Sequence, residues 1–345
     1  MSEKLHIALA FYDKNGEHSK FAGTTIASVF ENTAKRNWAN IVIHILHDDT
    51  LTEINRNRFI KLAEKYNSSI NFYNIKINNW NIDKEFFEKA LVRISLGALY
   101  RLALPKLLKN IDRVIYLDTD ILVQIDIYDL YNISFDKFYL LAVYDDENMR
   151  NLYVKTRYYK NAGLNYRLYF NSGVLVLNLK EIQKFNLLNH CLVKLQQFNK
   201  FADQDILNII FKDKIKFIDD KFNTLVDIQN LSDDSIEKFL NEKAILHFAG
   251  YLKPWNCANK EVIKLYYSYM AKTPWIKNND DIIAVMSDIS NEYNRKMDLK
   301  NCLYYKQVQG ISDKFLLGMK LVLNEKIYKR FLKTIRKFKL KLYFK

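Results

Sequence analysis

Two aspartates stand one residue apart inside the apolar run VIYLDTDILV, residues 114–123. Apolar residues flank Asp118 and Asp120 on both sides, so we expect the pair at the end of a buried strand. Two ionised carboxylates this close repel each other, and their burial is costly. A divalent cation such as Mg²⁺ or Mn²⁺ removes both penalties, because these ions prefer oxygen ligands. A helix cap or a simple turn after the strand is the alternative that this motif leaves open.

A third candidate ligand is His247, in the segment LHFAGYLKPW. An imidazole beside two carboxylates shifts the preference from Mg²⁺ toward Mn²⁺, although a histidine at a strand end is more often a satisfied core or turn residue. Gly250 would let the backbone approach a phosphate closely. Lys253 could meet a diphosphate as a point charge.

Polar residues in three other apolar segments could act on a bound substrate. Arg101 lies in the apolar segment LGALYRLALPKLL, where a lone charge is costly unless it meets a phosphate or a carboxylate. Asp203, Gln204 and Asp205 begin a predicted helix; a helix cap would account for one of them but not for all three. Asn171, in FNSG, lies at the mouth of a predicted strand, where a plain turn is the alternative.

Strands and helices alternate along the first part of the chain. Strands are expected at 5–11, 40–46, 69–75 and 113–118, with later ones in the segments 169–179 and 244–255. Helices are expected at 21–34, from a Thr50–Glu53 capping box to about Tyr66, and at 96–108 with a bend or break near Pro105. This alternation predicts βαβ units in a mostly parallel sheet. Ligands bind outside the carboxyl ends of such strands, where Asp13, Asp118 and Asp120 would lie.

The charge distribution argues against a nucleic-acid-binding body. The net charge is +14, of which +9 lies in residues 320–345 and +5 in the rest of the chain. This tail places apolar residues at helical spacing among lysines and arginines, which predicts a basic amphipathic helix suited to an anionic membrane surface. Packing of the tail on the body or on a second subunit is the alternative, and a homodimer is left open.

Cysteine usage and hydropathy point to the cytoplasm. The three cysteines are odd in number and far apart, so a disulfide framework is not expected. No apolar run approaches the about 20 residues of a membrane span, and the N-terminus lacks a signal-peptide pattern. We therefore expect a cytoplasmic protein, held peripherally at the inner face of the membrane by its tail.

The ordered set of these segments resembles glycosyltransferase family 8, which includes bacterial lipopolysaccharide galactosyl- and glucosyltransferases and glycogenin. The similarity covers roughly residues 5–275 and rests on IALAFYD, ISLGALYRLALPKLL, RVIYLDTDILV, YFNSGVLVLNL, DQDILN and HFAGYLKPW. It implies an α/β GT-A (Rossmann-like) domain over residues 1–275, a UDP-sugar donor, Mn²⁺ and retention at the anomeric carbon. Residues 276–345 are expected to form a helical C-terminal extension.

The resemblance also implies residue roles. The metal ligands it implies are Asp118, Asp120 and His247. The nucleotide-binding group it implies comprises Ala10, Tyr12, Asp13, Ile94, Asp118, Thr119, Gly250 and Lys253. The group around the donor sugar comprises Arg101, Asp145, Asn171, Asp203 and Gln204. One departure concerns the base: relatives often carry an acid at the position of Tyr12, whereas here the acid follows at Asp13, so Tyr12 could stack on the base instead.

The expected reaction is transfer of glucose or galactose to a cell-surface glycan or lipopolysaccharide-type acceptor. Because Gln204 is a poor nucleophile, front-face attack with Gln204 supporting the sugar cation is favoured, while Asp203 and Asp145 hold sugar hydroxyls. A metal-dependent nucleotidyl or phosphoryl transferase is a second interpretation, since paired aspartates serve there too. A nucleotide-sugar-binding pseudo-enzyme is the third.

Overall fold

The computed structural model describes residues 4–76, 96–145, 166–195, 202–228, 238, 240–250, 252–257 and 259–277. Ile94, almost all of the expected helical extension and its basic tail lie outside these ranges, so the expectations for them stay predictions. Within the described ranges, no helix combines the length and the apolar character that a membrane span requires.

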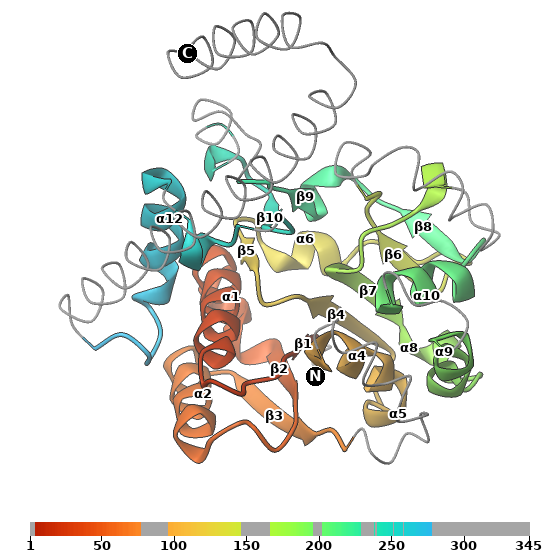
Figure 1. Ribbon diagram of the computed structural model, residues 1–345, viewed down its shortest axis with the longest axis horizontal. Coiled ribbons are helices and arrows are strands. Elements are labelled where there is room, and N and C mark those ends of the chain that lie inside the picture. Colours follow the sequence, from red (N-terminus) through yellow and green to blue (C-terminus); the bar gives the residue numbers. More distant parts are fainter. Residues whose placement is uncertain are drawn as a thin grey trace, which may run out of the picture. The chain divides into compact units, whose positions relative to one another are not determined.

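The N-terminal part of the described chain is a run of parallel βαβ units. It comprises β1 (Leu5–Ala10), α1 (His18–Asn32), β2 (Ile41–His47), α2 (Glu53–Lys65) and β3 (Ser69–Asn74). β1 pairs in parallel with β2, and β2 pairs in parallel with β3. These elements form one end of the sheet, with the red and orange helices α1 and α2 beside it (Figure 1). The predicted strands and helices of this region are confirmed within a few residues.

The central sheet has seven strands in the order β3-β2-β1-β4-β7-β6-β8. The strands after β3 are β4 (Arg113–Leu117), β6 (Leu140–Ala142), β7 (Val174–Asn178) and β8 (Ile215–Phe217). The predicted mostly parallel sheet is confirmed, with β7 antiparallel to both of its neighbours. Because β7 is reversed, its first residues, rather than its last, lie at the carboxyl edge of the parallel strands.

A second, three-stranded sheet has the order β5-β10-β9. It consists of β5 (Ile121–Val123), β9 (Thr224–Leu225) and β10 (Ile245–His247). Only three residues, 118–120, connect β4 of the large sheet to β5 of the small one. The paired aspartates therefore lie at the junction of the two sheets.

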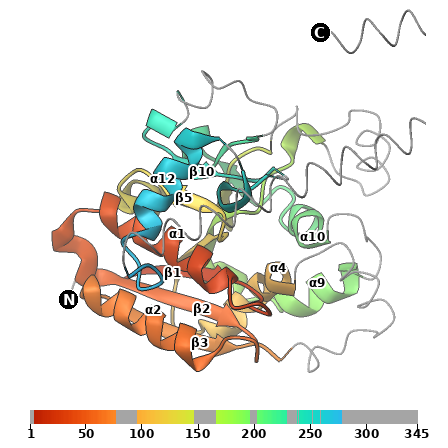
Figure 2. The same ribbon diagram turned by 60° about the vertical axis from the view of Figure 1, so that its left-hand side comes forward.

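The two faces of the large sheet carry different apolar clusters. Along β1, Leu5, Ile7 and Leu9 belong to one buried cluster, and Ala8 and Ala10 belong to the other. This alternation follows from the two-residue period of a strand. α1 packs beside α12 (Lys260–Met270) and β5, an arrangement visible in both views (Figures 1 and 2).

The remaining helical segments are short and connect the strands. They are η1 (Lys35–Asn40), α4 (Leu96–Tyr100), η3 (Arg101–Ala103), α5 (Leu104–Leu107), α6 (Ile127–Tyr131), η4 (Tyr166–Leu168), α8 (Leu179–Ile182), α9 (Leu187–Leu195), α10 (Ala202–Ile210), η5 (Asp220–Phe222) and η6 (Pro254–Asn256).

One local expectation needs correction. The cap of α2 is Thr52, whose side chain accepts a hydrogen bond from the Asn55 backbone N–H, and not Thr50. Thr50 instead accepts from the backbone N–H of Asp13.

The expected break near Pro105 is confirmed. A 3₁₀ turn at 101–103 interrupts the helical run 96–108, so Pro105 lies in the first turn of the next segment, where proline is tolerated.

A buried histidine on β2 links three strands. His44 Nε2 lies 2.9 Å from His6 Nδ1 on β1, and His44 Nδ1 lies 3.1 Å from the hydroxyl of Tyr73 on β3. Burial lowers the pKa of His44 to about 3, and the like charge of His6 contributes. The folded protein therefore holds this ring neutral over the ordinary pH range.

The lowered pKa predicts that acid weakens the fold through His44. The unfolded chain takes up this proton below pH about 6.5, whereas the folded protein takes it up only near pH 3. The contribution of a neutral His44 to the free energy of unfolding is therefore fully present above pH about 6.5 and is lost as the pH falls from about 6.5 toward about 3. Urea unfolding measures the free energy of unfolding at pH 7 and at pH 5. The decrease between the two pH values should be smaller by about 2 kcal/mol in His44→Gln than in wild type. An equal loss would contradict a neutral His44; His190→Gln, at an exposed position, is the control.

Candidate active site

The turn that carries Asp118 and Asp120 is fixed by backbone hydrogen bonds on both sides. The backbone N–H of Asp118 donates to the carbonyl of Gly173 at 2.8 Å, just before β7. The carbonyl of Asp120 accepts from the N–H of Phe248 at 3.0 Å, just after β10. Thr119, between the aspartates, accepts from the Thr25 hydroxyl through its carbonyl at 3.2 Å. Both carboxylates are therefore attached to a backbone that three other segments hold in place.

Helix α1 supports this turn through a polar stripe on its buried face. The Thr25 hydroxyl donates to the Ile121 carbonyl at 2.9 Å, and the Ser28 hydroxyl accepts from the Val123 N–H at 2.9 Å. The side-chain amide of Asn32 donates to the Val123 carbonyl at 2.8 Å. These α1 side chains satisfy backbone groups of β5 that would otherwise be buried without partners.

His247 is oriented by a chain of hydrogen bonds that begins at a backbone amide. The Gly173 N–H donates to Asn171 Oδ1 at 2.9 Å, which identifies that atom as the oxygen. Asn171 Oδ1 also accepts from Asn223 Nδ2 at 3.0 Å, so Asn223 presents its own Oδ1 to His247 Nδ1, 3.0 Å away. His247 Nδ1 therefore carries a hydrogen, which leaves Nε2 as the nitrogen that would bind a metal.

His247 Nε2 faces a carboxylate oxygen. Asp120 Oδ1 lies 3.4 Å from Nε2 and, although buried, has no hydrogen-bond partner within the described part of the chain. A proton on Nε2 or a metal cation would each satisfy this pair of atoms. Donor atoms of Asp118, Asp120 and His247 all lie within 4.8 Å of one another. Ligands around one octahedral cation stand about 3 to 4 Å apart, so small side-chain adjustments would let these three residues hold a divalent ion.

Gly173 makes room for the imidazole ring. A Cβ at this position would lie 2.2 Å from His247 Cε1, closer than real side-chain contacts permit. The glycine of FNSG is therefore required by the packing of a ring that comes from another sheet.

Arg101 is held by carboxylates rather than left free for a phosphate. Its Nη2 lies 2.8 Å from Asp118 Oδ1, its Nε lies 3.3 Å from Asp203 Oδ2, and its Nη1 donates to the Ser172 carbonyl. The guanidinium also lies over the ring of Tyr116, whose hydroxyl donates to Asp118. Burial alone would lower the pKa of Arg101, but Asp118 and the other neighbours raise it.

The first turn of α10 brings two predicted sugar-contacting residues to the same place. Asp203 is buried beside Arg101; burial raises its pKa, Arg101 opposes this, and Asp118 adds to it. Gln204 Oε1 accepts from the Ser172 N–H at 2.9 Å, and Gln204 Nε2 donates to Asp145 Oδ2 at 3.3 Å. The structure thus groups Arg101, Asp145, Asp203 and Gln204 around Ser172. Asn171, in contrast, is engaged through its oxygen in the support of His247.

Lys253 lies at the cluster of Asp118, Asp120 and His247. Its Nζ donates to Asp120 Oδ2 at 2.6 Å and to the Phe248 carbonyl at 2.7 Å. Burial would raise the pKa of Asp120, but His247 and Lys253 together lower it well below its usual range. Gly250 lies nearby in sequence and packs against Asp227, whose carboxylate would be 2.7 Å from an added Cβ.

Of the other predicted nucleotide contacts, Asp13 is already bound within the protein. Its carboxylate accepts hydrogen bonds from the N–H and the hydroxyl of Ser19 and from the side-chain amide of Asn55, and it is 1% exposed. Ala10 ends β1, and Tyr12 is half-buried in the segment that follows. The nucleotide roles of all three residues stay predictions.

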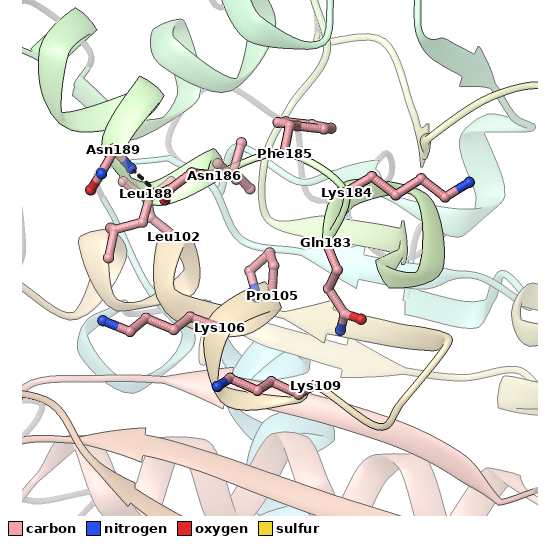
Figure 3. Close-up of a pocket in the computed structure, with 11 residues that line it drawn as sticks. Leu102, Pro105, Lys106, Lys109, Gln183, Lys184, Phe185, Asn186, Leu188 and Asn189 are labelled. Carbon is pink, nitrogen blue, oxygen red and sulfur yellow. Dashed lines mark hydrogen bonds between the residues drawn. The ribbon is translucent and has the colours of Figure 1, made fainter.

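A separate hollow of about 520 Å³ lies between α5 and the segment before α9 (Figure 3). Leu102 and Pro105 are among the residues that line it, and Lys106 and Lys109 extend to the opposite side from Lys184. None of the residues lining it belongs to the predicted site. The chemistry is therefore expected at the Asp118–Asp120–His247 cluster and not in this hollow.

The family model of glycosyl transferase family 8 matches residues 8–258. The chain belongs to this family. A putative glycosyltransferase of Haemophilus influenzae is 31% identical over 244 residues, covering 69% of this chain and 70% of the relative. A lipopolysaccharide 1,2-glucosyltransferase of Escherichia coli is 28% identical over 284 residues, covering 79% of this chain and 80% of the relative.

The family-8 chain also has the fold of a solved galactosyltransferase. The structure of LgtC in complex with donor and acceptor sugar analogues matches with a TM-score of 0.62 and 20% identity, covering 80% of this chain and 98% of that chain. This likeness confirms the predicted GT-A fold, and family membership confirms that the protein is a glycosyltransferase.

Several residues of this family-8 site were not predicted from the sequence. Asn223, Ser172 and the α1 stripe of Thr25, Ser28 and Asn32 support the cluster from other elements. Asn223 carries no local signal, because an asparagine before a short strand is ordinary. The stripe could have been noticed as polar residues at helical spacing within an otherwise apolar helix.

Asn223 gives a direct test of the oriented histidine. Asn223→Ala should weaken Mn²⁺ binding about tenfold or more, because a metal-ligating histidine loses affinity when the partner of its other nitrogen is removed. Isothermal titration calorimetry of the full chain measures the effect, and Asn189→Ala on α9 is the control. Wild-type affinity in Asn223→Ala would show that His247 does not bind metal in this orientation.

Proposed function

We propose that this family-8 glycosyltransferase is a metal-dependent, retaining enzyme. It would transfer glucose or galactose from a UDP-sugar to a glycan or lipopolysaccharide-type acceptor. The observation that supports the metal dependence is the convergence of donor atoms of Asp118, Asp120 and His247 within 4.8 Å of one another, with Asp120 Oδ1 lacking a hydrogen-bond partner among the described residues. The names of the lipopolysaccharide relatives support the donor and acceptor classes.

Asp118, Asp120 and His247 are the residues that would hold the cation. A divalent ion such as Mn²⁺ would supply charge stabilisation to the departing nucleoside diphosphate. The mixed oxygen and nitrogen donor set favours Mn²⁺ over Mg²⁺. The protein's own contribution is to hold these ligands before the substrate arrives, through Arg101 on Asp118 and Asn223 on His247.

The residues around Ser172 would receive the sugar. Gln204 holds its amide in a fixed plane, because its oxygen accepts from Ser172 and its nitrogen donates to Asp145. Gln204 Oε1 also accepts a longer hydrogen bond from the Ser172 hydroxyl, at 3.3 Å. A carbonyl oxygen has two lone pairs, so a positive anomeric carbon would take the place of this hydroxyl while the Ser172 N–H bond stays. Asp145 and Asp203 would hold sugar hydroxyls.

In this proposal the family resemblance implies retention, and front-face attack achieves it because Gln204 is a poor nucleophile. The acceptor hydroxyl would attack from the face that the diphosphate leaves, and the departing diphosphate would take its proton. Arg101 stays charged beside Asp118 and Asp203, so the two carboxylates keep their positions as the charge of the sugar changes.

Gln204 tests this arrangement. Gln204→Ala should leave the affinity for a UDP-sugar within about twofold and reduce turnover about a hundredfold, since support of the sugar cation is needed only in the transition state. Steady-state kinetics and calorimetry with the donor separate the two effects. Gln183→Ala, in the separate hollow, is the matched control. Full turnover in Gln204→Ala would refute the role assigned to this amide.

A further inference from the structure

Lys253 binds the same carboxylate that the proposed function assigns to the metal. Its ammonium donates to Asp120 Oδ2 at 2.6 Å, while the other oxygen, Oδ1, faces His247. The peptide of Phe248 completes the arrangement: its carbonyl accepts from Lys253 Nζ at 2.7 Å, and its N–H donates to the Asp120 carbonyl at 3.0 Å. Lys253 thus has a defined position beside the cluster.

Lys253 differs from the other cation of the site in its freedom to move. The side chain of Arg101 is 5% exposed and is bound by Asp118, Asp203 and Ser172, whereas the side chain of Lys253 is 25% exposed. The Lys253 backbone is anchored, since its N–H donates to Asn256 Oδ1 at 2.6 Å. A lysine side chain on an anchored backbone can swing its ammonium by rotation about four bonds.

A lysine ammonium and a divalent ion on one carboxylate repel each other. The ammonium and the ion would be separated only by the width of the Asp120 carboxylate. Water screens their repulsion only partly, because the Asp120 side chain is largely shielded from solvent. A cation entering the cluster therefore either displaces Lys253 or binds more weakly. A nucleoside diphosphate bound to that cation would offer the displaced ammonium new acceptor oxygens.

We propose that Lys253 is a displaceable cation that competes with the metal for Asp120. Its contact with the nucleoside diphosphate, which the family resemblance implies, would then form only after the metal has displaced it from Asp120. This inference rests on the proposed function, because it takes Asp118, Asp120 and His247 as the metal ligands. Lys253 therefore has opposite effects on the affinities of the two ligands. It lowers the affinity for metal alone and raises the affinity for the nucleotide in the presence of metal.

The test compares full-length wild type, Lys253→Met and Lys264→Met by isothermal titration calorimetry. Lys264 is the control because it is an exposed lysine on α12, away from the cluster. Without nucleotide, Lys253→Met should bind Mn²⁺ about tenfold more tightly than wild type, as expected for removal of one partly screened like charge. With saturating Mn²⁺, the same variant should bind UDP about tenfold more weakly. Thermal melts establish that each protein is folded.

The outcomes separate this inference from the proposed function. Mn²⁺ binding by Lys253→Met that equals or falls below that of wild type overturns the competition. Unchanged UDP affinity in Lys253→Met overturns the move to the diphosphate. A folded wild-type protein that binds no Mn²⁺ contradicts the proposed metal site, and the inference falls with it.

Discussion

Repulsion among three carboxylates is the constraint on which this site depends. Asp118, Asp120 and Asp203 converge at the carboxyl edge of the large sheet, and each has a side chain less than a quarter exposed. Arg101 pairs with both Asp118 and Asp203 but offsets only one of their two charges, and Lys253 pairs with Asp120. Asp120 Oδ1 faces His247 and has no hydrogen-bond partner among the described residues. In the proposed function a divalent ion adds positive charge at this point and takes the place of Lys253 on Asp120.

Much of the fold was predictable because its signals are local. β1 through β4 are short apolar runs bounded by turn residues, and their spacing identifies parallel units. The reversal of β7 was not predictable, since an antiparallel strand reads the same as a parallel one. That reversal explains why FNSG, which precedes its strand, lies beside Asp118, which follows its own.

The candidate site was predictable as a set of chemical groups but not as a set of contacts. The sequence left open whether Arg101 meets a phosphate or a carboxylate, and the structure shows two carboxylates. Asn171 was expected at the donor sugar, and the sequence did not reveal that its oxygen supports Asn223 and through it His247. Asp13 was expected at the sheet edge where a nucleotide would bind, and the sequence did not reveal that Ser19 and Asn55 donate hydrogen bonds to its carboxylate. Such partners come from distant segments, and a single sequence does not reveal which segments meet.

The most direct test of the central claim is metal-dependent cleavage of the donor. Purified full-length protein is incubated with a panel of UDP-sugars and Mn²⁺, with and without a chelator, and release of UDP is measured. We expect release of UDP from UDP-glucose or UDP-galactose that the chelator abolishes and added Mn²⁺ restores. Release that is unaffected by the chelator, or no release and no binding of any nucleotide sugar, would contradict it.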